Sequence, residues 1–406
     1  MCYSVNSVFK LISSGTVTSV NGFLAGAVCA GIKSGEELDL AILYSEVPCV
    51  AAGVFTTNRI KSAPVILSQK HLSERQAQAV VVNSGCANAC VGARGLADAS
   101  EMAKLAATKL DILPEDVLVA STGVIGMPLP MSHIRNGIER IKLHQDGGHE
   151  FGRAIMTTDT RPKEIAIKVD AESSKFTVAG VAKGAGMIHP NLATMLCFIA
   201  TDASVDVGFL QTSLQKAVDA SFNMISVDSD TSPSDCVLLL ANGLIGNETI
   251  SFVNGEIFQE ALTEVCLYLA KSIVRDGEGA TRFIEVVVEG AKKQDEARQA
   301  ARAIASSLAV KTAIHGNDPN WGRIIAALGR SGIEIVEEKI ELYLDNICVF
   351  RGGNLMPFDR ERVKATLVND ENVLIKLSLN LGDGKATAWG CDLSEEYVTI
   401  NSEYTT

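Results

Sequence analysis

Three segments of the chain repeat apolar residues at helical spacing, and we expect each to form a helix with one buried face. The shared faces are Leu210, Leu214, Ala217, Val218 and Phe222 in the first segment, Phe258, Leu262, Val265, Leu269 and Ile273 in the second, and Ala297, Ala301, Ile304 and Leu308 in the third. Asp295 is the expected N-cap of the third helix. The first two faces predict helices that cover a sheet.

Two other segments alternate apolar and polar residues, which is typical of strands with one buried face. The longer one contains Val373, Ile375, Leu377, Leu379 and Leu381, and the turn formers "GDGK" and the stretch "ATAW" follow it. This order predicts a β-hairpin. The shorter one is Ile340, Leu342 and Leu344. Two continuous apolar runs, 117–120 and 195–200, predict further strands, the second of them buried.

The order of these elements favours an α+β fold. Because strands and helices do not alternate in a steady βαβ rhythm, a doubly wound parallel sheet is disfavoured, and layered sheets flanked by helices fit better. The composition changes near Glu285 to Gln294. We therefore expect a main layered domain at residues 1–284 and a C-terminal α+β domain at residues 285–406.

Composition and charge narrow the class of protein. With 406 residues, 47% of them hydrophobic, the chain can bury a substantial core. A formal net charge of -12 argues against nucleic acid or anionic membranes as partners, because both require clustered Lys and Arg. The chain shows neither a secretory signal nor a long apolar span, so we expect a cytoplasmic protein. The six histidines show no metal spacing, and we expect neither a metal nor a cofactor.

One hydroxyl lies where a polar turn becomes a buried strand, in "HPNLATMLCFIATDA" (189–203). Thr194 is a poor nucleophile unless a base lies beside it. An N-terminal threonine has such a base in its own α-amine, whose ordinary pKa is roughly 7.7 to 8.0. Cleavage of the bond between Ala193 and Thr194 would create that amine. Taken alone, Thr194 is also compatible with an ordinary residue at the start of a strand.

Acyl transfer also requires donors for the oxygen that becomes negative in the tetrahedral intermediate. In "VLVASTGVIGMPLP" a strand ends at a turn that can present the Thr122 hydroxyl and the Gly123 amide; a simple strand-to-loop glycine is the alternative. Three other polar clusters are candidate ligand loops or solvated turns. They are Thr157, Thr158, Asp159 and Thr160 in "MTTDTRPKE", Lys183 in "AKGAGMI" and Glu278 in "RDGEGATR". The stretch "HGNDPNWGR" fits a structural turn and a functional loop equally.

Ten ordered motifs resemble the ornithine acetyltransferase family, the ArgJ-type glutamate N-acetyltransferases of arginine biosynthesis. They are "GFLAGAVCAGIK" with "DLAIL", "VFTTNRIKSAPV", "NSGCANAC", "ASTGVIG", "IMTTDTRPK", "AKGAGMIHPNLATML", "SVDSDTSPSD", "RDGEGATR", "HGNDPNWGR" and "GCDLSEEYVTINSEYTT". The resemblance runs nearly end to end, and it implies a layered helix/sheet/sheet/helix sandwich of the ArgJ/DmpA-like type. The chain departs from the family's pattern at Cys86, Ser229 and Pro233, where Asn, Gly and Thr are expected.

The resemblance also implies roles for particular residues. The precursor would cut itself between Ala193 and Thr194, which gives an α chain of residues 1–193 and a β chain that starts at Thr194. Thr194 would then be the nucleophile, with its freed amine as the base. The oxyanion hole falls on Thr122 and Gly123. The substrate-binding positions fall on Thr157, Lys183, Thr194, Glu278, Asn401 and Thr406.

The implied reaction is a ping-pong acetyl transfer from N2-acetyl-L-ornithine to L-glutamate through an acetyl-threonine intermediate, performed by an α2β2 heterotetramer. Acetyl-CoA is a further acetyl donor in some members of the family, and no motif decides whether it is one here. The closest rival is a self-processing N-terminal-nucleophile aminopeptidase or amidohydrolase, which passes the acyl group to water. A non-enzymatic binding protein is a third alternative.

Overall fold

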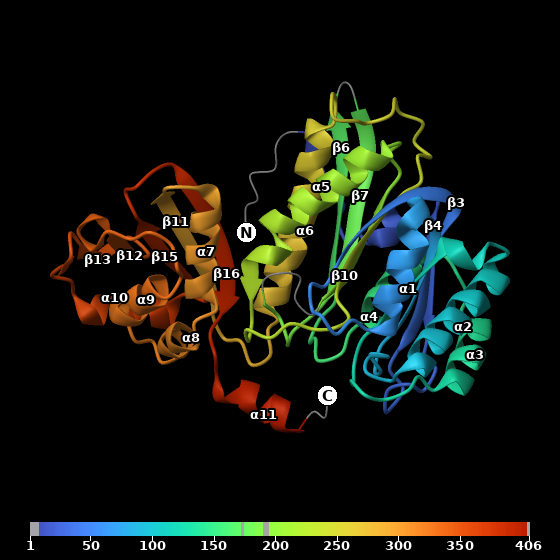
Figure 1. Ribbon diagram of the computed structural model, residues 1–406, viewed down its shortest axis with the longest axis horizontal. Coiled ribbons are helices and arrows are strands. Elements are labelled where there is room, and N and C mark those ends of the chain that lie inside the picture. Colours follow the sequence, from blue (N-terminus) through green and yellow to red (C-terminus); the bar gives the residue numbers. More distant parts are fainter. Residues whose placement is uncertain (1–7, 172–173, 190–194, 404–406) are drawn as a thin grey trace.

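The computed structural model describes residues 8–171, 174–189 and 195–403 (Figure 1). Strands of the described part form two sheets. The first sheet has nine strands in the order β1-β6-β7-β8-β10-β3-β4-β5, with β2 paired to β3. Its strands are β1 (Phe9–Leu11), β2 (Phe23–Val28), β3 (Leu40–Phe55), β4 (Gln76–Asn83), β5 (Val117–Ser121), β6 (Lys163–Ala171), β7 (Ser174–Lys183), β8 (Leu196–Thr201) and β10 (Cys236–Ala241).

The long strand β3 joins two halves of this sheet. Residues 40–45 of β3 pair with β2, whereas residues 50–55 pair with β10. Side chains from both halves meet in one apolar layer: Val80 and Leu118 from one half belong to the same buried cluster as Phe198 and Leu238 from the other. The two halves therefore pack face to face as two sheet layers.

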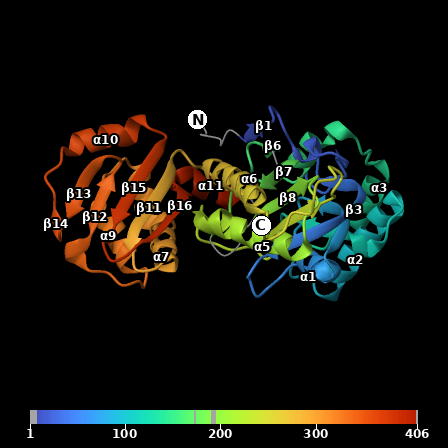
Figure 2. The same cartoon turned by 90° about the horizontal axis from the view of Figure 1, so that it is seen from above.

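Helices cover the outer face of each half (Figures 1 and 2). On one side, α1 (Ala63–His71), α2 (Ala93–Leu110) and α3 (Met131–Arg140) pack on β3, β4 and β5. On the other side, α5 (Val207–Ala220) and α6 (Glu256–Arg275) pack on the half that contains β6 to β8. The short α4 (Gly148–Ala154) contributes Phe151 to the layer between the sheets. The predicted helix/sheet/sheet/helix sandwich is confirmed, as are the two helices predicted to cover a sheet.

The continuous apolar run at 195–200 has its explanation in these layers. All six residues of β8 are buried, and alternate side chains enter different cores. Phe198 faces the layer between the sheets, whereas Ile199 belongs to the cluster under α5 and α6. A strand that is covered on both faces needs apolar residues at every position, so the run does not alternate.

The second sheet has seven strands in the order β14-β13-β12-β15-β11-β16-β9. They are β9 (Ile225–Ser226), β11 (Phe283–Ala291), β12 (Glu341–Leu344), β13 (Ile347–Arg351), β14 (Asn354–Leu355), β15 (Asn372–Ser378) and β16 (Gly384–Cys391). Helices α7 (Gln294–Ala305), α8 (Leu308–His315), α9 (Trp321–Gly329) and α10 (Arg360–Asn369) accompany it, and α11 (Glu395–Glu403) returns toward the first sheet (Figure 1).

The hairpin predicted at 373–389 is wrong. Its two strands exist as β15 and β16, but β11 lies between them, parallel to β15 and antiparallel to β16. The alternation of apolar residues correctly locates the buried face. It carries no information about which strand is the neighbour, because any strand offers the same backbone donors and acceptors.

The third predicted helix is shorter than expected. Helix α7 begins at Gln294 with Lys293 as its N-cap, so Asp295 lies in the first turn. Its negative charge there interacts favourably with the helix dipole. Leu308 starts the next helix and is 54% exposed. The domain boundary at 284/285 stays a prediction; position 284 lies within β11.

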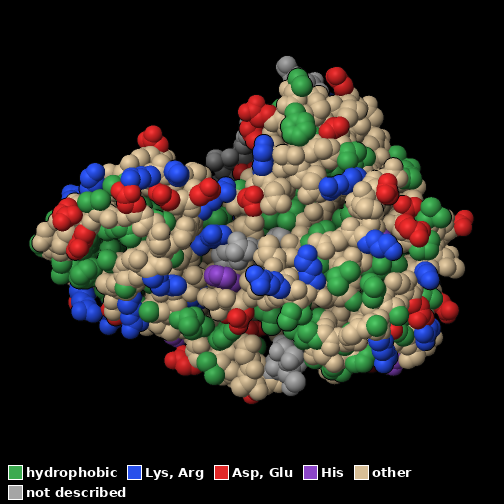
Figure 3. All heavy atoms as spheres, viewed as in Figure 1, with side chains coloured by type: hydrophobic (Ala, Val, Ile, Leu, Met, Phe, Trp, Pro, Cys, Tyr) green, Lys and Arg blue, Asp and Glu red, His purple; other side chains and the backbone are tan. Residues whose placement is uncertain are grey.

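The part that carries the second sheet forms a separate lobe in the space-filling view (Figure 3). On this face, acidic and basic side chains are interspersed over both parts. Among the described helices, none combines the length and apolar character that crossing a membrane requires.

Candidate active site

One pocket gathers every described residue that the sequence assigned to catalysis or substrate binding. Thr122 and Gly123 follow β5, Lys183 ends β7, and Asn401 lies on α11. The full lining is Ala87, Thr122, Gly123, Ile125, Thr157, Thr158, Lys183, Gly186, Met187, Ser232, Ser234, Glu278 and Asn401. Ala193, Thr194 and Thr406 lie outside the described residues.

The turn after β5 contributes Thr122 and Gly123 to the lining of this pocket. The N–H groups on either side of Gly123 are engaged, because Thr122 donates to the Asn83 carbonyl at 3.1 Å and Val124 donates to the Gly85 carbonyl at 3.3 Å. No described residue accepts a hydrogen bond from the Gly123 N–H. Gly123 has a φ of 123°, a conformation that side chains rarely adopt. The Gly123 amide and the Thr122 hydroxyl are thus available as a pair of donors.

Lys183 reaches into the same turn. Its ammonium donates to the Thr157 hydroxyl at 2.6 Å and lies 3.5 Å from the Thr122 hydroxyl. The side chain is 3% exposed, and this burial lowers its pKa, against the opposing effect of the nearby Asp159 carboxylate. A buried ammonium beside two hydroxyls is the strongest positive charge in the pocket. It favours anionic groups and keeps neighbouring amines neutral.

A carboxylate behind the pocket holds this arrangement in place. Asp159 is fully buried and accepts hydrogen bonds from the amides of Thr157 at 3.0 Å and Gly184 at 2.7 Å. It also lies 2.5 Å from the Lys163 ammonium and 3.8 Å from that of Lys183. Although burial opposes ionisation, the charges of Lys183 and Lys163 hold the pKa of Asp159 well below its usual range.

Lys163 and Asp276 complete a buried charge network that the sequence analysis did not identify. Lys163 bridges Asp159 and Asp276, with 2.6 Å between its ammonium and Asp276 Oδ2. Asp276 also accepts hydrogen bonds from the amide and hydroxyl of Thr160. Lys163 belongs to the motif "MTTDTRPK" and Asp276 to "RDGEGATR", so the sequence marks each of the two segments. Nothing in the sequence indicates that the two residues pair across 113 positions.

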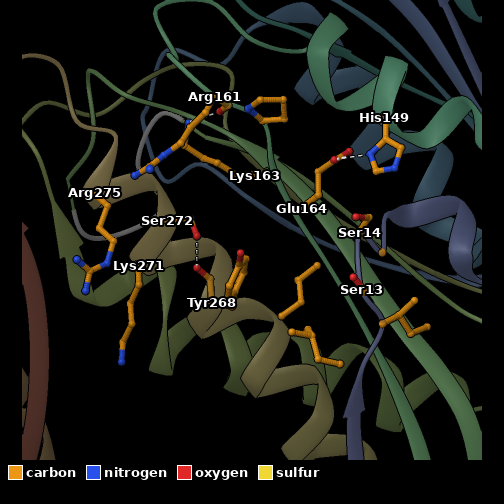
Figure 4. A pocket seen from close by; sticks show the side chains of 15 residues that line it. Ser13, Ser14, His149, Arg161, Lys163, Glu164, Tyr268, Lys271, Ser272 and Arg275 are labelled. Atoms are coloured by element: carbon orange, nitrogen blue, oxygen red, sulfur yellow. Dashed lines mark hydrogen bonds and ion pairs between the residues drawn. The ribbon is translucent and has the colours of Figure 1, made fainter. Parts of the chain in front are cut away.

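Lys163 also lines a second groove, which lies between β1, β6 and α6 (Figure 4). Two other basic side chains of this groove, Lys271 and Arg275, contact aromatic rings. The Lys271 ammonium lies 4.8 Å from the ring centre of Trp389, and the Arg275 guanidinium lies 3.9 Å from that of Phe283. In Figure 4 both side chains extend from α6 away from His149 and Glu164.

Glu278 adds a carboxylate to the pocket that Lys183 also lines. Its amide donates to the Ala185 carbonyl at 2.9 Å, which fixes the loop after α6 against the glycine-rich loop after β7. Its carboxylate accepts a hydrogen bond from Asn401 Nδ2 at 2.7 Å. A methyl group on Gly186 would lie 2.4 Å from this carboxylate, so the glycine makes room for it. A lining that holds both Lys183 and Glu278 suits a zwitterionic ligand such as an amino acid.

The start of β8 lies beside this pocket. Leu196 pairs with Lys183 in the sheet, and the Met195 amide donates to Asp235 Oδ1 at 3.0 Å. Asp235 is 1% exposed, and burial raises its pKa well above the usual value. Asp235 is the last residue of the motif "SVDSDTSPSD", and no local pattern there indicates its role.

One departure from the family's pattern has a visible backbone consequence. Ser229 has a φ of 75°, the left-handed region in which glycine is favoured. The glycine that the resemblance leads us to expect at this position would suit the backbone found here, and the chain adopts that backbone with serine. The Ser229 hydroxyl donates to the Ser306 carbonyl at 3.0 Å, which offsets part of the cost.

Comparison with known proteins identifies the family. The model of the ArgJ family matches residues 24–406. The arginine biosynthesis bifunctional protein ArgJ of Dehalococcoides mccartyi is 55% identical over 407 residues, which cover 99% of this chain and 100% of that protein. The protein of the same name from Symbiobacterium thermophilum is 49% identical over 399 residues, covering 97% of this chain and 99% of that protein.

Solved structures of related proteins are similar to parts of the chain. A crystal structure of the arginine biosynthesis bifunctional protein from Bacillus halodurans is 44% identical and covers 50% of this chain and 96% of that chain, with a TM-score of 0.49. The family match and the identity to full-length relatives suffice for the assignment: the chain belongs to the ArgJ family.

Proposed function

We propose that the chain cuts itself between Ala193 and Thr194 and then transfers the acetyl group of N2-acetyl-L-ornithine to L-glutamate. The observation that carries the proposal is the single pocket in which Thr122, Gly123, Thr157, Lys183, Glu278 and Asn401 meet beside the start of β8. These residues come from segments that are far apart in the sequence, and only the family's motif pattern connected them before the structure was considered. Their meeting supports one common chemistry.

In the first half of the reaction, the Thr194 hydroxyl attacks the acetyl carbon of acetylornithine, and the freed α-amine of Thr194 takes the hydroxyl proton. The carbonyl oxygen becomes negative and accepts hydrogen bonds from the Thr122 hydroxyl and the Gly123 amide. When the intermediate collapses, the C–N bond breaks, the proton passes to the departing amine, and ornithine leaves. The acetyl group remains as an ester on Thr194.

In the second half, the glutamate amine attacks the ester carbon and gives its proton to the α-amine of Thr194. The C–O bond breaks, the threonine hydroxyl is restored, and N-acetylglutamate departs. We assign Lys183 to the α-carboxylate shared by donor and acceptor, and Glu278 to the side-chain ammonium of ornithine. The positive charge of Lys183 also keeps the Thr194 amine neutral, which is the form that accepts a proton.

Self-cleavage is tested by intact-mass analysis and a denaturing gel. The wild-type chain is expected to give two fragments, residues 1–193 and 194–406, whereas Thr194→Ala stays whole because it lacks the attacking hydroxyl. An uncut wild-type chain after long incubation contradicts both the cleavage and the proposed base.

Transfer is tested by incubation with N2-acetylornithine, with and without glutamate. We expect N-acetylglutamate to form in proportion to the ornithine released, and little release without glutamate. Rapid deacetylation that ignores glutamate supports a hydrolase instead. The same assay with acetyl-CoA as donor decides whether the chain has the second activity. We propose that no cofactor takes part; the α2β2 assembly and the cytoplasmic location stay predictions.

A further inference from the structure

The motif "HGNDPNWGR" has no part in the chemistry above, yet its first residue connects the C-terminal segment to the rest of the protein. His315 is the last residue of α8, and both of its ring nitrogens face carboxylates. Its Nδ1 lies 2.8 Å from Asp392 Oδ2, and its Nε2 lies 3.1 Å from Glu395 Oε2. Asp392 follows β16 directly and Glu395 is the first residue of α11. The imidazole thus spans the entry to the helix that carries Asn401.

Asp392 is the fixed end of this connection. Its side chain is fully buried, and its Oδ1 accepts hydrogen bonds from the amides of Thr281 and Arg282, both at 2.8 Å. Its Oδ2 accepts the Thr281 hydroxyl at 2.6 Å as well as the imidazole. Thr281 and Arg282 belong to the same loop as Glu278. The Asp392 carboxylate therefore holds the C-terminal segment against the loop that supplies a wall of the pocket.

Helix α11 depends on polar contacts of this kind. It has nine residues, none of them buried, and a helix so short is not stable by itself in water. Three polar contacts join it to the rest of the protein: Glu395 with His315, the Tyr397 hydroxyl with Asp228 at 3.3 Å, and Asn401 with Glu278 at 2.7 Å. Because no residue of α11 is fully buried, these polar contacts have a direct influence on where Asn401 lies.

We propose that His315 is a positioning residue, which binds Asp392 and Glu395 at once and so holds α11 where Asn401 meets Glu278 and the substrate. The inference rests on the proposed acetyl transfer for its kinetic consequence, but not for its structural one.

The two-sided contact requires a charged ring. An imidazole donates from both nitrogens only when it is protonated, and the hydrogen bond to Asp392 raises the pKa of His315 above its usual value. Nearby cations make other contacts: the Lys311 ammonium binds the Cys391 carbonyl, and Arg323 binds the Ala309 carbonyl and the Thr312 hydroxyl. The contact is therefore complete at low pH and loses one donor as the pH rises through the raised pKa.

The test compares wild type with His315→Gln at pH 6 and pH 9. We expect the KM for acetylornithine to rise about 5- to 20-fold at pH 6, with kcat changed less than about twofold, because the substitution removes a charge-assisted contact that supports binding. At pH 9 the wild-type ring carries less charge than at pH 6, because the pH has risen toward or past its raised pKa, so the ratio of the two KM values should fall to about threefold or less. The ratio of the two KM values removes the effect of other groups that titrate in both proteins.

Hydrogen exchange of the amides at 395–403 gives a readout that is independent of activity. Faster exchange in His315→Gln at pH 6 supports the inference even if no transferase activity exists, a result that would separate it from the failure of the proposed function. Glu395→Gln removes only the solvent-side partner and should reproduce part of both effects. His133→Gln, a change of an exposed histidine on α3 that contacts the Ala30 carbonyl, is the matched control and should change neither.

Two results overturn the inference. One is an unchanged KM together with unchanged exchange at 395–403 in both His315→Gln and Glu395→Gln. The other is a KM ratio that is the same at pH 6 and pH 9. If the substitution only perturbs the local structure, its effect on KM does not depend on the charge of the ring.

Discussion

Replacement of Gly123 by alanine tests the oxyanion hole most directly. The new methyl group would lie 2.3 Å from the Gly85 carbonyl carbon and 2.6 Å from the Cys86 nitrogen, both of them backbone atoms that cannot rotate away. The backbone at position 123 must therefore move, and with it the amide that we assign to the oxyanion. In addition, a φ of 123° is unfavourable for alanine.

Two magnitudes follow from this geometry. Backbone strain of about 1–3 kcal/mol and a steric term of similar size should lower the free energy of unfolding by about 2–6 kcal/mol. Loss of one oxyanion donor should lower the rate of acetyl transfer by roughly a hundred- to a thousandfold. Self-cleavage should slow as well if it uses the same donor. Urea denaturation measures the first magnitude, and steady-state formation of N-acetylglutamate measures the second.

Gly126→Ala provides the control. Gly126 lies in the same loop with a φ of 85°, but a methyl group there would meet no atom within 4 Å. It should lose about 1–2 kcal/mol of stability to the left-handed conformation and keep its transfer rate. A Gly123→Ala protein that folds and transfers acetyl groups within threefold of wild type would refute the assignment of this amide.

Three further predictions concern the residues around the pocket. Asp159→Asn leaves the buried ammonium groups of Lys163 and Lys183 with less opposing charge, and urea denaturation should show a loss of about 3–5 kcal/mol; a loss below about 1 kcal/mol contradicts the network. Burial raises the pKa of Asp228 to about 6, so its contribution is largest at low pH and is lost as the pH rises from about 4 to 7. Urea denaturation at pH 4 and pH 7 should show that the free energy of unfolding falls by about 3 kcal/mol more in wild type than in Asp228→Asn. Equal decreases in the two proteins would contradict the raised pKa of Asp228. Ser229→Gly relieves a φ of 75° at the cost of one hydrogen bond, and thermal unfolding should show a gain of about 0.5–1 kcal/mol; any loss of stability would mean that the hydrogen bond outweighs the strain.

Much of the candidate site was predictable because its residues stand in short, compositionally unusual motifs. Lys183 lies just before the glycines of "AKGAGMI", Glu278 lies between two glycines, and Thr122 lies at the end of an apolar strand, so each was visible in a window of a few residues. The residues that were missed have ordinary local surroundings. Lys163 and Asp276 became a pair only when the end of α6 approached the start of β6, because a charge pair of this kind is defined by distance in space.

The sequence by itself determined which faces of its helices and strands are buried, since the periods of 3.6 and 2 residues are local properties of the backbone. It also determined the family, through the order of its motifs. The tertiary structure decided which strands are neighbours, placing β11 between β15 and β16, because every strand offers the same hydrogen-bonding edge and only packing selects the partner. It likewise decided that His315 meets Asp392 and Glu395, a contact across 77 and 80 positions that no local pattern encodes.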